Sequence, residues 1–252
     1  MLKIARFQVE GRVAYGLVED GSVREIEGDL FGEFAATGPS HPLDRVKLLT
    51  PCVPSKVLAV GLNYSSHLSG RKAPEEPGIF LKSPSALLEP EGTIILPRDA
   101  GLVEPEGELV VVMGQRARRV KPENALQYVL GYTCGDDVSG RTWQRNDLQW
   151  WRAKASDTFA PLGPYIVTDI EPDNLDLEVR INGEVKQRGN TSELIFDVPA
   201  IVSFISEVMT LEPGDVIYTG TPGTPGSTKA GDTVEVEVFG IGVLKNYVAD
   251  EE

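Results

Sequence analysis

The sequence of 252 residues is long enough for one large domain, or for one main domain with a small additional one. It carries 24 Lys and Arg against 38 Asp and Glu, and the resulting net charge of −14 argues against binding to nucleic acids or anionic membranes. No apolar run approaches the roughly 18 residues that span a bilayer, and the N-terminus lacks a signal-peptide pattern. Cys52 and Cys134 have no metal-binding spacing, which favours reduced thiols. We therefore expect a cytoplasmic protein with no nucleic-acid or membrane partner.

The N-terminal fifty residues predict a small β subdomain. Alternating residues around Glu10-Gly11 and Asp20-Gly21 predict an antiparallel meander over residues 2–8, 12–19 and 22–26. A weakly periodic stretch follows, and it contains His41, which we interpret as a surface residue. We place the domain boundary near residue 50, so residues 1–50 form the subdomain and residues 51–252 the main domain.

The main domain is predicted to be mainly β. The whole chain contains 26 Gly and 18 Pro, and this high share favours turns between short strands. One helix is expected over residues 198–209, where Asp197 can cap the first turn and apolar residues form one stripe. Strands are expected at residues 56–62, 79–82, 93–96, 108–113, 165–168, 175–181, 216–218, 233–238 and 243–248.

A Glu-x-Glu sequence precedes the apolar strand at residues 108–113. In an extended strand Glu106 and Glu108 point to the same face, and Gly107 between them permits a close approach of backbone or ligand. Two carboxylates on one face repel unless a cation joins them. Without further evidence, a solvated acidic turn remains the simpler interpretation of this sequence.

Four further segments carry polar side chains of chemical interest. Asp136 and Asp137 follow an apolar stretch, and with Arg141 and Gln144 they are able to surround a cavity or to form a turn with an exposed arginine. His67 follows a strand and suits proton transfer, although a single histidine is more often structural. The other two segments are a lone lysine amid small residues, Lys154, which by itself predicts a loop, and a glycine-rich turn around Thr221 that lacks a P-loop sequence.

Taken together and in this order, these segments resemble the fumarylacetoacetate hydrolase family. The resemblance covers roughly residues 55–248 and rests on eight motifs in register. They are Gly61-Leu62-Asn63-Tyr64 with His67, Phe80-Leu81-Lys82, Glu106-Gly107-Glu108-Leu109, Asp137-Val138-Ser139 with Arg141 and Gln144, Lys154 with Asp157, Pro161-Leu162-Gly163-Pro164, Asn182-Gly183 with Gln187, and Pro213-Gly214-Asp215 with Thr219-Gly220-Thr221-Pro222.

The resemblance implies a fold, a metal and a set of site residues. The fold is mainly β (α+β), with a mixed β-roll or barrel core and few short helices, and the protein is expected to be a homodimer that binds Mg²⁺ or Mn²⁺. Three carboxylates without histidine or thiolate indeed form an oxygen site suited to such ions. The implied metal ligands are Glu106, Glu108 and Asp137, the catalytic residues His67 and Lys154, and the substrate-binding residues Tyr64, Lys82, Arg141, Gln144 and Thr221.

The implied substrate is a small 2-oxo acid that chelates the metal, with Lys154 and the metal neutralising an enolate oxygen. Hydrolytic and some decarboxylating relatives have the motif His-x-x-Glu, whereas this chain has Gly70 in place of the glutamate. We expect His67 to lose its orienting partner, unless Glu75 or Glu76 replaces it, and hydrolysis to suffer more than isomerisation or decarboxylation. Arg71 and Lys72 are candidates for binding a distal carboxylate.

The sequence therefore favours a metal-dependent isomerase or decarboxylase of unsaturated 2-oxo or 2-hydroxy-dienoic dicarboxylates, as in the breakdown of aromatic acids. The alternatives are an acylpyruvate or fumarylpyruvate hydrolase, an oxaloacetate decarboxylase and, from another class, a metal-binding scaffold protein without turnover.

Overall fold

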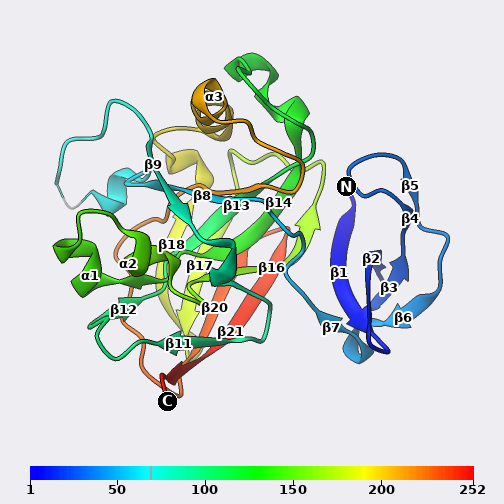
Figure 1. The fold of residues 1–252 in the computed structure, drawn as a ribbon, viewed down its shortest axis with the longest axis horizontal. Helices are drawn as coiled ribbons and strands as arrows, with labels where there is room; N and C mark the ends of the chain where they lie inside the picture. The colour runs from blue at the N-terminus through cyan, green and yellow to red at the C-terminus, as the bar shows by residue number, and fades with distance from the viewer. Residues whose placement is uncertain (69) are drawn as a thin grey trace.

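The computed structural model describes residues 1–68 and 70–252, and Ser69, in the segment between His67 and Gly70, lies outside the described residues. The architecture is mainly β with a few short helices, as predicted (Figure 1). In the described part of the chain, none of the helices is long and apolar enough to cross a membrane.

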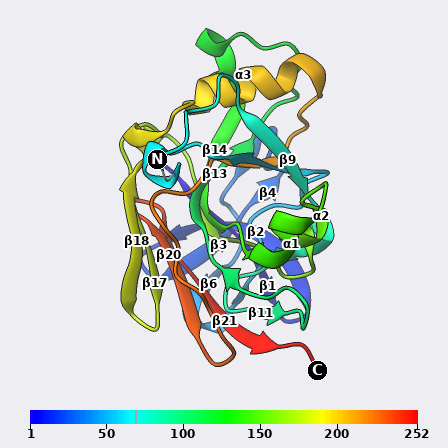
Figure 2. The same cartoon turned by 90° about the vertical axis from the view of Figure 1, so that its left-hand side faces the viewer.

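A large mixed sheet runs through the molecule (Figures 1 and 2). Its main path is β6-β3-β2-β1-β16-β14-β13-β19-β8-β9, while β7 pairs with β1 and β10 with β16. Most neighbours are antiparallel, but β19 runs parallel to β8, and β10 parallel to β16. The strands are β1 (Lys3–Val9), β2 (Arg12–Glu19), β3 (Ser22–Glu25), β6 (Ser40–Pro42), β7 (Lys47–Leu48), β8 (Val57–Gly61), β9 (Gly78–Lys82), β10 (Leu87–Leu88), β13 (Gly107–Met113), β14 (Val129–Asp136), β16 (Ala160–Val167) and β19 (Val216–Tyr218).

A second sheet packs against the first, in the order β11-β21-β20-β17-β18. Its strands are β11 (Thr93–Leu96), β17 (Asp176–Ile181), β18 (Glu184–Asn190), β20 (Thr233–Val238) and β21 (Gly242–Asp250). Two short pairs, β4 (Glu27–Gly28) with β5 (Phe34–Ala35) and β12 (Val103–Glu104) with β15 (Ser139–Gly140), lie outside both sheets. The helices are α1 (Arg141–Asn146), α2 (Trp151–Ala155) and α3 (Val198–Val208), with 3₁₀ turns η1 (Leu43–Arg45), η2 (Ser65–His67), η3 (Pro84–Ala86), η4 (Pro122–Tyr128) and η5 (Thr191–Glu193).

Strand β13 separates two hydrophobic cores, because successive side chains of a strand point to opposite faces. Leu109 and Val111 pack with Val179 and Val236 of the second sheet. Val110 and Val112, which alternate with them, belong to a core on the other face. Every residue of β13 is buried, so the acidic residues that begin this strand are held on a rigid base.

The predicted N-terminal meander and the helix near residue 200 are both confirmed. Strands β1, β2 and β3 pair in order around the two expected turns, and Figure 1 shows them on one side of the molecule, with α1 and α2 on the other. Helix α3 begins after Asp197, whose side chain accepts a hydrogen bond from the amide of Ala200. Strand β1 also pairs with β16, so the meander continues the large sheet, and the boundary at residue 50 stays a prediction.

Two elements near the site differ from the prediction. Residues 129–136 form β14, which was not expected because Gly131 and Gly135 are poor strand formers. Both glycines serve packing, since a Cβ at Gly135 would lie 2.4 Å from the ring of Tyr218 and one at Gly131 only 2.4 Å from the carbonyl of Val167. The predicted loop around Lys154 is instead helix α2.

Candidate metal centre and adjoining cavity

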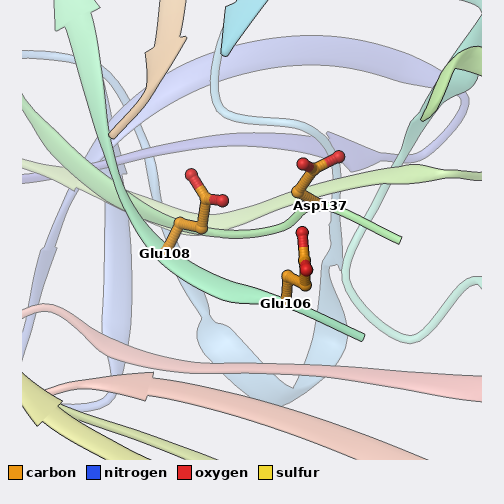
Figure 3. Close-up of side chains that lie close together, drawn as sticks. All are labelled: Glu106, Glu108 and Asp137. Carbon is orange, nitrogen blue, oxygen red and sulfur yellow. The ribbon is translucent and has the colours of Figure 1, made fainter. Parts of the chain in front are cut away.

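Three carboxylates lie together at the ends of two neighbouring strands (Figure 3). Strands β13 and β14 are antiparallel with Gly107 opposite Asp136, so Glu106 and Asp137 are neighbours, and the amide of Asp137 donates a 2.8 Å hydrogen bond to the carbonyl of Glu106. Glu108 lies two positions along β13 and faces the same side as Glu106. One oxygen from each carboxylate lies within 4.8 Å of the others.

The cluster is buried. The exposed fraction is 4% for Glu106 and 2% for both Glu108 and Asp137, so the alternative interpretation as a solvated acidic turn is wrong. Burial and then the negative charge of Asp137 raise the pKa of Glu108 well above its ordinary value. Burial also opposes the ionisation of Glu106, but the neighbouring cations outweigh it and lower the pKa of Glu106.

Two buried lysines bind the cluster. Lys154 in α2 donates to Oε2 of Glu106 at 2.6 Å, to Oδ2 of Asp137 at 2.5 Å and to Oγ of Ser139 at 2.6 Å. Lys82 at the end of β9 donates to Oδ1 of Asp137 at 2.5 Å and to the backbone carbonyl of Lys154. An ammonium group has three N–H donors. All three donors of Lys154 are therefore engaged within the protein.

Arg141, the first residue of α1, connects the cluster to the outside. Its guanidinium donates to Oε1 of Glu106 at 2.6 Å, to Oε2 of Glu104 at 2.5 Å and to Oε1 of Gln144 at 2.7 Å. Of the two interpretations of this segment, the structure favours the cavity rather than the turn with an exposed arginine.

His67 has an orienting partner, contrary to the expectation from the missing glutamate. Its Nδ1 lies 2.6 Å from the carbonyl oxygen of Gly223, and its Nε2 lies 3.6 Å from Oε1 of Glu106. Glu75 does not replace the glutamate, because it pairs with Lys72 at the surface, with both side chains more than four-fifths exposed. Glu76 is also exposed.

The site has a small inner cavity and a larger outer one. The inner cavity has a volume of about 30 Å³, which is large enough to hold a water molecule. Seven of the predicted site residues line it: His67, Glu106, Glu108, Asp137, Gln144, Lys154 and Thr221. The outer cavity has a volume of about 390 Å³, and its lining includes His67, Arg71, Arg141 and Arg145.

Two predicted substrate-binding residues do not line either cavity. Lys82 reaches the cluster but is buried behind it, against Asp137. Tyr64 is fully buried, and in the described part of the chain its hydroxyl has no hydrogen-bond partner. Burial, followed by the charge of Glu108, raises the pKa of Tyr64. Direct contact with substrate is therefore not supported for these two side chains.

The residues fit a divalent metal ion. Four carboxylates are buried in this region, those of Glu106, Glu108, Asp136 and Asp137, and three cations, Lys82, Lys154 and Arg141, form ion pairs with Glu106 and Asp137. Glu108 forms no ion pair within the described residues and accepts a hydrogen bond from the amide of Gly220. A donor set of three carboxylates, one of them lacking a cationic partner, suits Mg²⁺ or Mn²⁺.

Sequence reasoning missed several participants. Ser139 lies inside a motif that was recognised, but the hydroxyl was given no role. Arg145 directly follows Gln144, and its proximity to a predicted site residue was the available signal. Gly223 contributes only its backbone, so its residue type gives no chemical signal.

Fold and site thus define a β protein with a candidate metal centre beside a cationic cavity, and comparison with known proteins identifies the family. The model for the fumarylacetoacetate (FAA) hydrolase C-terminal domain matches residues 56–249, and the Rv2993c-like N-terminal model matches residues 2–51. The chain belongs to the fumarylacetoacetate hydrolase family.

Three similar proteins carry informative names. A crystal structure of 2-hydroxyhepta-2,4-diene-1,7-dioate isomerase from Mycobacterium marinum is 44% identical with a TM-score of 0.94, covering 100% of this chain and 99% of that one. The mitochondrial oxaloacetate tautomerase Fahd2a of Rattus norvegicus is 39% identical over 85% of this chain and 73% of its own length. Maleylpyruvate hydrolase from Sphingobium sp. SYK-6, solved with manganese(II) and pyruvate, is 30% identical with a TM-score of 0.83, covering 99% of this chain and 100% of that one.

Proposed function

We propose that this chain is a divalent-metal-dependent isomerase or decarboxylase of unsaturated 2-oxo dicarboxylates. The observation that carries the proposal is the buried carboxylate cluster of Glu106, Glu108 and Asp137 beside a cavity lined by arginines. Membership of the family and the similarity to a protein named as a dioate isomerase support it. When bound by these carboxylates, Mg²⁺ or Mn²⁺ supplies Lewis-acid polarisation of the substrate's keto group.

In this proposal, Lys154 stabilises the enolate of the substrate. Because its three donors are engaged, it has to exchange one of them for the enolate oxygen. Ser139 is the neutral partner of the three, and its hydroxyl also donates to the carbonyl of Asp137 at 2.8 Å. Giving up this contact leaves both ion pairs of Lys154 intact.

In this proposal, His67 transfers the proton. In the isomerisation, a C–H bond next to the keto group breaks, its electron pair forms the enolate, and the proton returns to the far end of the conjugated system. An imidazole that faces the inner cavity through Nε2 is suited to accept and return that proton.

The outer cavity favours a second carboxylate on the substrate. Arg71 and Arg145 line it, and Nε of Arg145 donates to the carbonyl of Arg141 one helical turn earlier, at 3.2 Å. Lys72, the other candidate, pairs with Glu75 at the surface. A neighbouring apolar cavity of about 290 Å³ lies beside Trp150 and offers no cation for such a group. We infer that the distal carboxylate lies between Arg71 and Arg145.

The test compares an unsaturated 2-oxo dicarboxylate with its monocarboxylic analogue, using purified protein and Mg²⁺. We expect Arg145→Gln to lower kcat/KM for the dicarboxylate about tenfold, as for loss of one charged contact, with little change for the analogue. Arg116→Gln is the matched control, since Arg116 is 70% exposed and pairs with Glu212 outside the cavity. Equal losses on both substrates would contradict the assignment of Arg145, and inactivity of the wild type on all 2-oxo acids would contradict the function.

A prediction for His67 follows from its role. His67→Gln is expected to lower kcat by roughly 10²–10⁴, the range of general acid–base catalysis, while Mg²⁺ affinity measured by calorimetry changes little. Activity within threefold of wild type would make His67 structural.

Hydrolysis of acylpyruvates is the second candidate. One observation favours it: His67 is oriented by Gly223, so the missing glutamate at position 70 no longer argues against activation of water. A relative named as a maleylpyruvate hydrolase shares the fold. Following product formation from an acylpyruvate in the same assay distinguishes the two candidates.

A homodimer is proposed from the family resemblance alone. Light scattering of the purified protein is expected to give about twice the chain mass of 27.4 kDa.

A further inference from the structure

The turn that follows β19 forms hydrogen bonds with the 3₁₀ turn η2 through Gly223. The carbonyl oxygen of Gly223 lies 2.6 Å from Nδ1 of His67, and the amide of Gly223 donates a 3.1 Å hydrogen bond to Oγ of Ser66. A carbonyl oxygen only accepts hydrogen bonds, so Nδ1 of His67 carries the proton. In the neutral ring, Nε2 then has a free lone pair directed to the side of Glu106.

We propose that the backbone carbonyl of Gly223 fixes the tautomer and orientation of His67, and that Ser66 is a positioning residue that holds this carbonyl in place. The inference rests on the proposed function, in which Nε2 of His67 accepts the substrate's proton. A ring protonated at Nε2 has no lone pair there and cannot accept that proton.

The turn is held on its other side by a buried glutamine. The side chain of Gln187 in β18 donates to the hydroxyl of Thr221 at 2.9 Å and to the carbonyl of Pro222 at 2.7 Å. Thr221 in turn donates to the carbonyl of Gly107 at 2.8 Å. The partner of His67 is thereby connected to β13, the strand that carries Glu108, and does not depend on a mobile side chain.

Glycine is needed at position 223 for its backbone conformation and not because a side chain would clash there. Its φ of +63° lies in the left-handed region, whereas an added Cβ would meet no atom within 4 Å. This conformation points both the amide and the carbonyl of Gly223 at η2.

A carbonyl differs from a carboxylate in charge. The carbonyl accepts the proton of Nδ1 in a hydrogen bond and so favours the same His67 tautomer as a carboxylate would. Unlike a carboxylate, it adds no negative charge to a region that already holds four buried carboxylates. In the described structure no carboxylate contacts Nδ1 of His67, and the one nearest to its ring is Glu106, at Nε2. Orientation by a neutral group is therefore consistent with the high acidic charge of this site.

The test reads the tautomer directly by ¹⁵N NMR of histidine-labelled, Mg²⁺-loaded protein, at a pH where the ring is neutral. The chain has only two histidines, so the spectrum of His41→Ala assigns the signals of His67. We expect the proton on Nδ1 in the wild type. A proton on Nε2 would overturn the proposal. This measurement needs no turnover, so Nδ1 protonation in an enzyme inactive on every 2-oxo acid would contradict the proposed function and leave the positioning intact.

Ser66→Ala removes the hydroxyl that holds Gly223. We expect a rise in the Nε2-protonated fraction of His67 and a kcat about tenfold lower, with KM and Mg²⁺ affinity within twofold of wild type. Ser65→Ala is the matched control, because Ser65 is exposed and its hydroxyl makes no hydrogen bond in the described structure. A fall in kcat with an unchanged tautomer, or no change in either quantity, would show that Ser66 does not position His67.

Discussion

Glu108 and Asp137 belong to one acidic cluster, but the two side chains have different surroundings. Asp137 accepts hydrogen bonds from both Lys82 and Lys154, whereas Glu108 accepts a hydrogen bond from the backbone amide of Gly220. Burial and the charge of Asp137 raise the pKa of Glu108, so ionised Glu108 is unfavourable when no metal is bound. Neutralising Glu108 and neutralising Asp137 should therefore have different effects on stability.

We predict that Glu108→Gln leaves the free energy of unfolding of the metal-free protein unchanged or higher. Asp137→Asn should lower it by about 3 kcal/mol, because the buried ammonium group of Lys82 loses its carboxylate partner and that of Lys154 keeps only Glu106. Urea unfolding in the presence of a chelator measures both changes. Calorimetry should show that both variants lose Mg²⁺ binding, and wild-type affinity in Glu108→Gln would contradict its assignment as a ligand.

At this scale the sequence predicts the charged members of the site well and their contacts poorly. Carboxylates, His67 and Lys154 stand in recognisable motifs, and the structure brings them together around one cavity. Residue types do not show that all three N–H donors of Lys154 form hydrogen bonds within the protein, or that the carbonyl of Gly223 contacts His67. Both depend on the path of backbone segments that are distant in sequence.

Among the secondary-structure elements, β13 meets the second sheet so closely that one of its residues has to be glycine. A Cβ at Gly107 would lie 2.3 Å from Cγ2 of Val179 and 3.1 Å from Cγ1 of Val236. Gly107 stands between two carboxylates of the cluster, so this sheet contact also sets where Glu106 and Glu108 lie.

We predict that Gly107→Ala costs about 1–3 kcal/mol of stability and weakens Mg²⁺ binding. Val179→Ala alone should destabilise by about 2 kcal/mol through the cavity that it leaves. Because the smaller side chain makes room for the new Cβ, the double variant should be less destabilised than the sum of the single variants in urea unfolding. Strictly additive stability losses would show that the Cβ at position 107 does not overlap with the side chain of Val179.

A polar cluster stabilises the N-terminal meander. Arg12 donates to Oε2 of Glu25 at 2.8 Å, and Nε2 of His41 lies 2.6 Å from Oε1 of Glu25. The side chain of His41 is 21% exposed and contacts Glu25, so His41 is partly buried rather than the surface residue that we expected. The hydrogen bond from Arg12, and to a smaller extent that with His41, lowers the pKa of Glu25 although burial opposes the shift.

A lowered pKa in the folded state stabilises the fold above the unfolded-state pKa of roughly 4.3, and this contribution is lost as the pH falls through the folded-state pKa. We predict that Glu25→Gln costs about 1 kcal/mol at pH 6 and less at pH 3.5, measured by denaturant unfolding. Glu27→Gln is the control, since Glu27 is exposed and has no ion pair in the described structure. A difference between wild type and Glu25→Gln that does not shrink in acid would contradict the role of this pair.

Elements with a regular pattern were the predictable ones. The apolar alternation of β17 and β20 and the cap and stripe of α3 are local signals, and the structure confirms these elements. Strand β14 was not predicted because its glycines are required by close packing against Tyr218 and β16. This tertiary contact is not visible in the local sequence. Helix α2 is a short helix of five residues and lacks a side-chain cap.

In the whole molecule, the N-terminal meander covers an edge of the large sheet. Residues Lys3 and Ile4 of β1 pair with β16, and Ile4 is fully buried in the core that contains Leu162 and Ile166. Removing residues 1–50 would expose this apolar surface together with an unpaired strand edge. The carboxylate cluster lies at the ends of β13 and β14, and within the described residues its hydrogen bonds and ion pairs involve none of the residues 1–50.

We therefore predict that a chain of residues 51–252 unfolds at lower denaturant concentration and self-associates, yet binds Mg²⁺ with an affinity within threefold of that of residues 1–252. Light scattering, urea unfolding and calorimetry measure the three quantities. Ile4→Ser in the chain of residues 1–252, which puts a hydroxyl into the same apolar contact, should reproduce part of the destabilisation, whereas Val13→Ser, at a position 49% exposed, should not. Loss of Mg²⁺ binding by a truncated chain that remains folded would show that the meander supports the metal centre, and that a boundary near residue 50 does not separate independent units.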